Sequence, residues 1–272
     1  MKLENVTLAI LGAGNMGSAL CRGAIEGEVL KPEQVIVTDK VAEKAKDLGR
    51  ELDVTVGATN REAVRKASAV VLAVKPQDVD GVMAEAGGLF TAERLLISIC
   101  AGVSCAHLEA LMPAGGRVVW AMPNTPMLVC AGAVGLAAGK NATEADLDLA
   151  RTLFGAAALV VVVADERLID AVTAVSGSGP AYFFYLIEAM IAAGVAEGLP
   201  EADARALACR TAFGVATLLD ETGERPEVLR QRVTSPGGTT QAAIEVLDRA
   251  HVRDLLVTAV RRAAERSREL GR

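Results

Sequence analysis

The sequence predicts an α/β protein in which a doubly wound, mainly parallel sheet is followed by an all-helical region. Short runs rich in Val, Ile and Leu alternate with stretches of helical period up to Ala164, and no such run follows that residue. The 272-residue chain is 51% hydrophobic but only 3% aromatic, so its core must consist mainly of aliphatic side chains, as in helices and strands buried on both faces. We therefore expect two domains, residues 1–164 and 165–272.

The predicted strands all lie in the first region and share a short, apolar, β-branched character. They are Val6–Leu11, Val35–Asp39, Val54–Val56, Ser68–Val74, Arg94–Cys100, Arg117–Met122 and Ala158–Val163. Helical stretches separate most of them, as expected when parallel strands are joined by helices that pack on the two faces of the sheet.

The second region shows helical period, most clearly over Glu201–Gly223 and Thr239–Leu270. Ser176–Tyr182 predicts a break at which a new helix begins, with Pro180 in its first turn. Helices so rich in Ala and Leu have broad apolar faces that a small helical domain cannot bury by itself. This region is therefore expected to form a dimer interface.

Charge and hydropathy exclude several classes of partner. The net charge of -6 argues against nucleic acid, which requires a clustered basic surface. No uninterrupted apolar stretch is expected to reach the ~20 residues of a bilayer-spanning helix, and the first residues do not resemble a secretion signal. We expect a cytoplasmic protein that binds neither membranes nor nucleic acid.

The cysteines and histidines indicate no metal site. The five cysteines lack a metal-ligand spacing and are expected to be small buried apolar residues: Cys21, Cys100, Cys105, Cys130 and Cys209. With only two histidines, neither a metal centre nor a Ser-His-Asp triad is supported. Any chemistry is therefore expected to depend on an organic cofactor.

A glycine-rich turn follows the first predicted strand. Gly12, Gly14 and Gly17 have the Gly-x-Gly-x-x-Gly spacing at the start of a helix. In such a turn the first glycine permits the tight bend, the second lets a pyrophosphate approach the backbone, and the third permits close packing of helix and strand. In this β/α context, the motif predicts a Rossmann-type dinucleotide-binding domain.

The end of the second predicted strand bears on the choice of nucleotide. Asp39 stands where an acidic side chain accepts hydrogen bonds from the ribose hydroxyls of NAD, whereas the adjacent Lys40 is suited to the 2′-phosphate of NADP. The two residues favour opposite nucleotides, and the sequence leaves the preference between NADH and NADPH open.

Three further segments combine turn residues with polar groups. Ala73–Gln77 and Met122–Pro126 follow two strands at the edge where open α/β sheets bind ligands, although each is also compatible with a solvated or rigid loop. Ser235–Thr240, Ser-Pro-Gly-Gly-Thr-Thr, interrupts the helical region. This segment fits an ordinary helix cap and an anion-binding helix start equally well.

Six segments together resemble the pyrroline-5-carboxylate reductase family, in the same order and at suitable spacing across nearly the whole chain. They are Gly-Ala-Gly-Asn-Met-Gly, Ala-Val-Lys-Pro, Met-Pro-Asn-Thr-Pro, Ala-Val-Ser-Gly-Ser-Gly-Pro-Ala-Tyr, Val-Thr-Ser-Pro-Gly-Gly-Thr-Thr and Arg-Ser-Arg-Glu-Leu. The resemblance implies NAD(P)H-dependent reduction of 1-pyrroline-5-carboxylate to proline, and interlocked dimers that often form decamers. The Val-Thr-Asp-Lys end of the second strand departs from the Ser-rich phosphate pocket of members that prefer NADPH.

The resemblance also implies roles for individual residues. The expected cofactor-binding residues are Gly12, Gly14, Asn15, Met16 and Gly17 at the pyrophosphate, Asp39, Lys40 and Asn60 at the adenosine, Ala73, Lys75 and Pro76 at the nicotinamide ribose, and Ala101 and Asn124 at the nicotinamide. The expected substrate-binding residues are Ser235, Gly237, Gly238, Thr239 and Thr240. Of these, Thr240 is the expected catalytic residue, with its hydroxyl near the ring nitrogen, and no metal is expected.

The chemistry of such a substrate accounts for the Gly-Gly-Thr-Thr loop. A cyclic imine with a carboxylate needs a site that holds an anion, and the N–H groups of Gly237 and Gly238 at a helix start are suited to this. Thr240 can hydrogen-bond the ring nitrogen without titrating.

Two alternative functions remain. One is a β-hydroxyacid dehydrogenase-like reductase, although the first long helix of the helical region lacks the lysine that such an enzyme usually has there. The other is a non-catalytic nucleotide sensor, which would not need both the glycine-rich turn and the substrate loop.

Overall fold

A computed structural model describes residues 3–271, which form two compact units. The first unit comprises the described residues up to Ser178 together with those from Ala263 onward. The second unit is Gly179–Arg262. The domain boundary expected after Ala164 falls between the last strand of the sheet and the start of the second unit. Whether the nucleotide-binding domain ends at Ala164 stays a prediction.

The first unit contains an eight-stranded sheet with the strand order β3-β2-β1-β4-β5-β6-β7-β8. The strands are β1 (Leu8–Leu11), β2 (Val35–Thr38), β3 (Thr55–Val56), β4 (Ala69–Leu72), β5 (Leu95–Ser98), β6 (Arg117–Pro123), β7 (Gly132–Ala138) and β8 (Ala158–Val162). Neighbouring strands are parallel except β6 and β7, which are antiparallel. The expected Rossmann-type sheet is therefore confirmed, with its switch point between β1 and β4.

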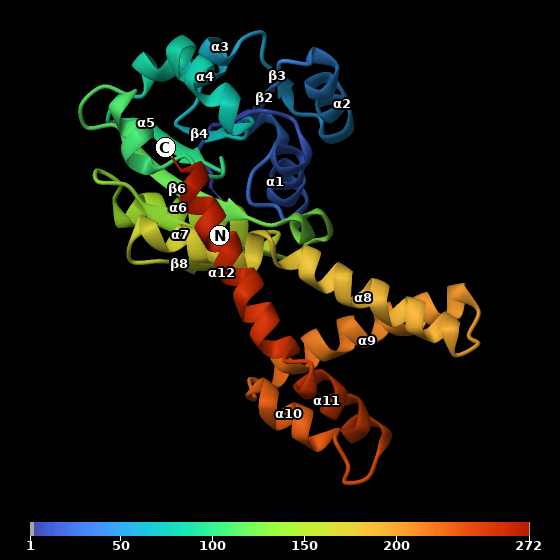
Figure 1. Ribbon diagram of the computed structural model, residues 1–272. Coiled ribbons are helices and arrows are strands. Elements are labelled where there is room, and N and C mark those ends of the chain that lie inside the picture. The colour runs from blue at the N-terminus through green and yellow to red at the C-terminus, as the bar shows by residue number, and fades with distance from the viewer. Residues whose placement is uncertain (1–2, 272) are drawn as a thin grey trace. The chain divides into compact units, whose positions relative to one another are not determined.

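Helices cover both faces of this sheet (Figure 1). The helices of the first unit are α1 (Asn15–Glu26), α2 (Ala42–Leu52), α3 (Asn60–Lys66), α4 (Val79–Ala86), α5 (Cys105–Ala110), α6 (Glu144–Gly155) and α7 (Ile169–Val172). Strand β1 shows why two layers form: Leu8 and Ile10 join a core cluster with α1, α2 and α6, while Ala9 and Leu11 join a second cluster with α3, α4 and α5. All four side chains are fully buried, as expected for a central parallel strand.

Strand β7 was not predicted from the sequence. Its composition, Gly-Ala-Val-Gly-Leu-Ala-Ala, has little β-propensity. Packing requires its glycines, because a Cβ atom at Gly135 would lie 2.6 Å from Cγ1 of Val172 at the end of α7, and one at Gly132 would lie 2.3 Å from Cγ of Met127. Close approach of neighbouring segments therefore explains the two glycines of this strand.

The described second unit is helical, with α8 (Gly179–Ala196), α9 (Glu201–Thr222), α10 (Pro226–Arg232), α11 (Thr239–Arg249) and the start of α12 (Val252–Leu270). The break expected before Pro180 is a π-helical turn, Thr173–Gly177, that leads into α8. The helical stretch expected over Thr239–Leu270 is divided at His251, whose φ of 52° ends α11.

One expectation about apolar residues stays a prediction, and another is wrong. Glu166–Ala196 is long and apolar enough to cross a membrane by length and composition alone. Core and interface helices pass the same test, so this observation is weak evidence for a membrane span. Cys130 and Cys209 are exposed, whereas the other three cysteines are buried. Cys130 sits in a turn with a φ of 53° and Cys209 lies in α9, so apolar character alone does not predict their burial.

Candidate functional site

The glycine-rich turn between β1 and α1 has the geometry that its spacing predicts. Gly12 has a φ of 116°, and a Cβ atom there would lie 2.4 Å from the carbonyl oxygen of Ala73. A Cβ atom at Gly17 would lie 2.0 Å from the carbonyl oxygen of Gly12. In contrast, a Cβ at Gly14 would have no atom of the described residues within 4 Å. The backbone at Gly14 therefore borders open space at the start of a 12-residue helix, which is the cradle that a pyrophosphate needs.

Asp39, directly after β2, is held by two backbone groups. Its Oδ2 atom accepts a hydrogen bond from the N–H of Ala13 in the glycine-rich turn, and its Oδ1 atom accepts one from the N–H of Val41, both at 2.8 Å. The carboxylate therefore links the turn to the start of α2. Each oxygen keeps a further lone pair that can accept from a ribose hydroxyl.

Lys40 points to a different partner. Its Nζ atom lies 2.6 Å from Oδ2 of Asp78, in the turn Pro76–Asp78 that follows β4. The ammonium group of Lys40 is therefore paired with a carboxylate of the neighbouring loop, a partner that the sequence did not reveal because Asp78 lies far away along the chain.

Asn60, the first residue of α3, is fixed by its neighbours. Its Oδ1 atom accepts from the hydroxyl of Thr38 at 2.7 Å, and its Nδ2 atom donates to Oε2 of Glu85 at 3.0 Å. Oε1 of Glu85 also accepts from the N–H of Arg61 at 3.3 Å. Glu85 is a second acidic residue of the site that sequence reasoning missed.

These residues line one cavity of about 730 Å³ at the carboxyl ends of β1, β2 and β4. The expected cofactor residues that it brings together are Gly12, Gly14, Asp39, Lys40, Asn60, Ala73 and Lys75. Asn15 lines an adjoining cavity of about 280 Å³ that shares Gly14 and Lys44 with the first. The cavity lies at the edge and switch point where open α/β sheets bind nucleotides, so its residues fit NAD(P)H.

The remaining expected cofactor residues do not line either cavity. Gly17 is buried and Met16 packs partly against the core, whereas Pro76 and Ala101 are exposed. The carboxamide of Asn124 is bonded within the protein: Oδ1 accepts from the N–H of Ala133 at 2.9 Å, and Nδ2 lies 3.3 Å from the carbonyl oxygen of Ser176. Asn124 thus joins two predicted motifs, Met-Pro-Asn-Thr-Pro and Ser-Gly-Ser-Gly-Pro.

The loop that contains Ala101 is anchored on both sides. Nε1 of Trp120 donates to the carbonyl oxygen of Cys100 at 3.2 Å. On the other side, Gly102 has a φ of 70° and packs against Leu270 at the end of α12. The same turn of α12 is also bonded to α7, since the hydroxyl of the buried Ser267 donates to Oδ1 of Asp170 at 2.6 Å. The C-terminal Arg-Ser-Arg-Glu-Leu motif therefore supports this loop.

Cys100 beside this loop is chemically inert. Burial raises the pKa of its thiol to about 11, so the thiol stays protonated at neutral pH. Desolvation likewise raises the pKa of Cys21 to about 12. The buried cysteines of the first unit therefore act as packing groups.

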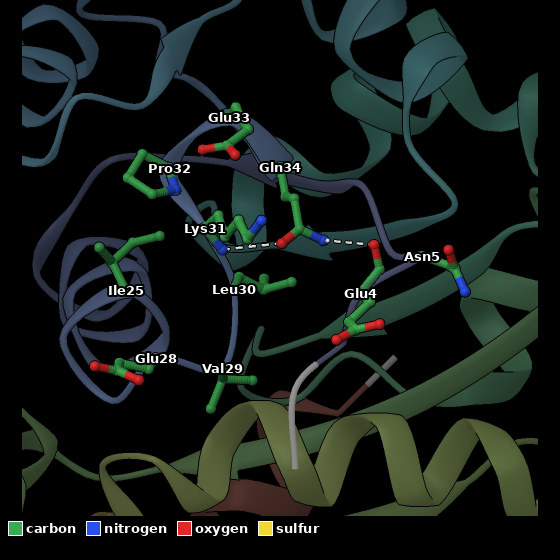
Figure 2. A pocket seen from close by; sticks show the side chains of 10 residues that line it. All are labelled: Glu4, Asn5, Ile25, Glu28, Val29, Leu30, Lys31, Pro32, Glu33 and Gln34. Atoms are coloured by element: carbon green, nitrogen blue, oxygen red, sulfur yellow. Dashed lines mark hydrogen bonds between the residues drawn. The ribbon is translucent and has the colours of Figure 1, made fainter.

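A second cavity of similar size, about 750 Å³, lies near the amino end of β2 (Figure 2). Gln34 organises it: its Oε1 atom accepts from the N–H of Lys31 at 2.9 Å, and its Nε2 atom donates to the carbonyl oxygens of Leu3 and Val6 at 2.7 Å. Ligands of open α/β sheets bind at the opposite edge, so this cavity is not the candidate nucleotide site.

The Ser-Pro-Gly-Gly-Thr-Thr loop of the second unit precedes α11. Gly237 has a φ of 72°, and Gly238 is the residue before the helix. The N–H of Gly237 donates to Oε1 of Gln241 at 2.7 Å, and the N–H of Gly238 donates to the carbonyl oxygen of Ser235 at 3.0 Å. The two N–H groups expected to hold an anion are therefore already bonded within the loop. The first-turn N–H groups of α11, beginning with Thr239 and Thr240, are the ones that helix geometry leaves for an external acceptor.

Comparison with known proteins identifies the family. A pyrroline-5-carboxylate reductase dimerisation model matches residues 166–270, and a model for NADP oxidoreductases that depend on coenzyme F420 matches residues 7–102. The pyrroline-5-carboxylate reductase of Methanosarcina acetivorans is 43% identical over 99% of this chain and 100% of that protein. The chain belongs to the pyrroline-5-carboxylate reductase family. The expected resemblance is thereby confirmed.

Other relatives extend the match to plants and to solved structures. The pyrroline-5-carboxylate reductase of Arabidopsis thaliana is 38% identical over 98% of this chain and 96% of its own. The structure of the Coxiella burnetii enzyme has a TM-score of 0.93 at 36% identity, covering 98% of this chain and 99% of that one. The Plasmodium falciparum enzyme, solved with NADP bound, has a TM-score of 0.88 at 29% identity and covers 99% of both chains. The family relationship therefore includes both units and the motifs of each.

Proposed function

We propose that this chain reduces 1-pyrroline-5-carboxylate to L-proline with NAD(P)H, the last step of proline biosynthesis. The observation that carries the proposal is the full-length relationship to pyrroline-5-carboxylate reductases in a chain that keeps an open glycine cradle. The chemistry that NAD(P)H supplies when bound is a hydride for the imine carbon.

The first unit holds the nucleotide in this proposal. The turn formed by Gly12, Gly14, Asn15, Met16 and Gly17 binds the pyrophosphate, with Gly12 and Gly17 shaping the backbone and Gly14 leaving room for the anion. The adenosine end lies against Asp39, Lys40 and Asn60, and the nicotinamide ribose along Ala73, Lys75 and Pro76. Ala101 and Asn124 shape the nicotinamide end. Asn124 does so indirectly, because its carboxamide accepts from the backbone N–H of Ala133 and holds that segment in place.

The second unit supplies the substrate loop in this proposal. Ser235, Gly237, Gly238, Thr239 and Thr240 surround the substrate, and its carboxylate accepts hydrogen bonds from first-turn N–H groups of α11, where the helix dipole favours an anion. The hydroxyl of Thr240 bonds the ring nitrogen. Because a protonated imine is already electrophilic, the main task of these groups is orientation, which can contribute on the order of 7–11 kcal/mol to catalysis.

Self-association completes the proposal. The dimerisation family model matches residues 166–270, and large apolar side chains of α8 are exposed in the single chain: Phe183 is 63% and Tyr185 is 76% exposed. We infer a homodimer in which a second copy covers α8, with dimers assembling into a decamer. We also infer a cytoplasmic location, and we assign the apolar Glu166–Ala196 segment to this interface.

The proposal is tested by following loss of reduced-nicotinamide absorbance with the purified chain, 1-pyrroline-5-carboxylate and NADH or NADPH in parallel. Formation of proline in equal amount is the expected result. The matched control is Gly14→Val, whose side chain would occupy the space of the pyrophosphate without a clash with the backbone. This variant is expected to fold but to lose turnover. Tight nucleotide binding without turnover, by wild-type protein shown to be folded and dimeric, would instead indicate a nucleotide sensor. Reduction of a 3-oxo acid would indicate a β-hydroxyacid dehydrogenase-like enzyme.

A further inference from the structure

We propose that the adenosine end of this site selects NADH over NADPH, through a carboxylate fixed at Asp39 and a lysine neutralised at Lys40. The inference rests on the proposed function, because it assigns the nucleotide of that same site. By residue type alone, Asp39 favours NADH and Lys40 favours NADPH. The contacts of the two side chains show which of them is available to the nucleotide.

Asp39 cannot withdraw from an added phosphate without breaking the turn that it supports. Its two oxygens accept from the N–H groups of Ala13 and Val41, both at 2.8 Å, so the side chain is fixed from opposite sides. A ribose 2′-hydroxyl donates to a carboxylate, whereas a 2′-phosphate offers it only like charge. The fixed Asp39 therefore accepts NADH and repels NADPH.

Lys40 is the natural cation for a 2′-phosphate at this position, but it is engaged elsewhere. Its Nζ atom lies 2.6 Å from Oδ2 of Asp78. Asp78 is itself held in the turn after β4, where its N–H donates to the carbonyl oxygen of Lys75 at 2.9 Å. The Lys40 side chain is 68% exposed, so the ion pair adds little to stability. Its importance here is that a 2′-phosphate must compete with Asp78 for the ammonium group.

The other charged groups of the cavity do not restore a phosphate site. Glu85 adds a carboxylate at the adenosine end, fixed by Asn60 and Arg61. Within residues 3–271, Lys44 forms no ion pair, but it lines both cavities that meet at Gly14. Because both cavities are bounded by Gly14, we assign this charge to the pyrophosphate, which NADH and NADPH share. Lys75 follows β4, on the nicotinamide side of the proposed site.

The test is the dissociation constant of each nucleotide for the full-length protein, measured by isothermal titration calorimetry without substrate. ADP-ribose and 2′-phospho-ADP-ribose are titrated in parallel to isolate the adenosine end. We expect NADH and ADP-ribose to bind at least about tenfold more tightly than their phosphorylated counterparts. Equal affinities, or tighter binding of NADPH, would overturn the proposal.

Two variants separate the contributions. Asp78→Asn releases Lys40 and leaves Asp39 intact, so NADPH should bind severalfold more tightly while NADH is unchanged. Asp39→Ser removes the repelling charge and should bring the ratio of the two constants to one or below. Asp248→Asn, in α11 of the second unit, makes the same change in net charge and should leave both constants unaltered.

Each outcome has a distinct meaning. An Asp78→Asn protein with unchanged NADPH affinity would refute the role of the ion pair, and an Asp39→Ser protein with an unchanged ratio would refute the role of the carboxylate. If no nucleotide supports reduction of 1-pyrroline-5-carboxylate but the binding ratio persists, the proposed function fails and this inference stands. Turnover with both nucleotides at equal affinity would refute this inference alone.

Discussion

The two glycine-containing loops of the molecule differ in what constrains them. In the turn after β1, backbone atoms of the sheet and the turn itself surround Gly12 and Gly17. In the loop before α11, a Cβ atom at Gly237 would have no atom of the described residues within 4 Å, and the loop is held by hydrogen bonds to Ser235 and Gln241. Both loops contain hydrogen bonds, but the backbone leaves no room for a side chain at Gly12 or Gly17, whereas Gly237 in the second loop is not enclosed in this way.

If the first turn is fixed by packing, the largest loss of stability should follow a substitution at Gly17. Gly17→Ala would place a Cβ atom 2.0 Å from the carbonyl oxygen of Gly12, so the turn must rearrange. We expect a loss of about 3 kcal/mol or more in the free energy of unfolding, measured by urea denaturation. Gly14→Ala is the matched control and should weaken nucleotide binding with little change in stability. If the Gly17→Ala and wild-type proteins were equally stable, the conclusion that packing fixes this turn would be wrong.

The next largest effect is expected at Thr240. Thr240→Ala removes the hydroxyl proposed to bond the ring nitrogen, and a hydrogen bond to a charged group contributes about 1.5–3 kcal/mol. Steady-state kinetics should show kcat lowered roughly tenfold to a hundredfold, at 1.4 kcal/mol for each factor of ten, with unchanged stability and nucleotide affinity. Thr240→Ser should recover most of the rate. A fully active alanine variant would exclude this role.

Gln241 provides a finer test of the second loop. Gln241→Ala removes the acceptor of the Gly237 N–H, which costs about 1 kcal/mol of loop ordering, equivalent to roughly a fivefold rise in KM for the imine. Glu245→Ala is the control, because it removes only the outer partner of Gln241. A change in unfolding free energy as large as that of Gly17→Ala would show that this loop is also constrained by packing.

The smallest loss of stability is expected at Ser267, whose hydroxyl forms a single hydrogen bond between α12 and α7. Ser267→Ala removes the bond to Asp170, but that carboxylate is only partly buried and water can replace the lost donor, so the free energy of unfolding should fall by only roughly 0.5–1 kcal/mol, read from the urea midpoint. KM for the nucleotide should rise slightly, since the end of α12 supports the Ala101 loop. Arg266→Ala, whose Nη1 atom pairs with Glu269 at 2.8 Å on the exposed side, should have a smaller effect on both quantities.

Local patterns in the sequence predicted most of the fold. Buried β-branched runs identified strands such as β1 and β4, and the glycine spacing identified the cradle, because both features are properties of contiguous residues. Strand β7 was missed because neighbours outside the strand require its glycines: Met127 lies against Gly132, and the more distant Val172 of α7 lies against Gly135. A pattern of contiguous residues carries no information about such a distant neighbour.

The same limit applies to the site. Asp39 and Lys40 were identified from the sequence, but their opposite tendencies remained unresolved until Ala13, Val41 and Asp78 appeared as partners. The anion-binding role expected for Gly237 stays a prediction, and the sequence did not reveal that the side chain of Gln241 accepts from its N–H. Residue type predicted where chemistry is located, whereas tertiary partners determined which groups are available.

The crowding at Gly12 and Gly17 also limits how this enzyme can evolve. The atoms that exclude a side chain at these positions are backbone carbonyl oxygens, of Ala73 and of Gly12. Every amino acid has that carbonyl group, so no second substitution at the contacting residue can create room. A side chain at Gly17 therefore cannot be accommodated by replacing the residue that it strikes, and any compensation must come from stabilising changes elsewhere. Lys40, whose side chain forms an exposed ion pair with Asp78, carries no such restriction.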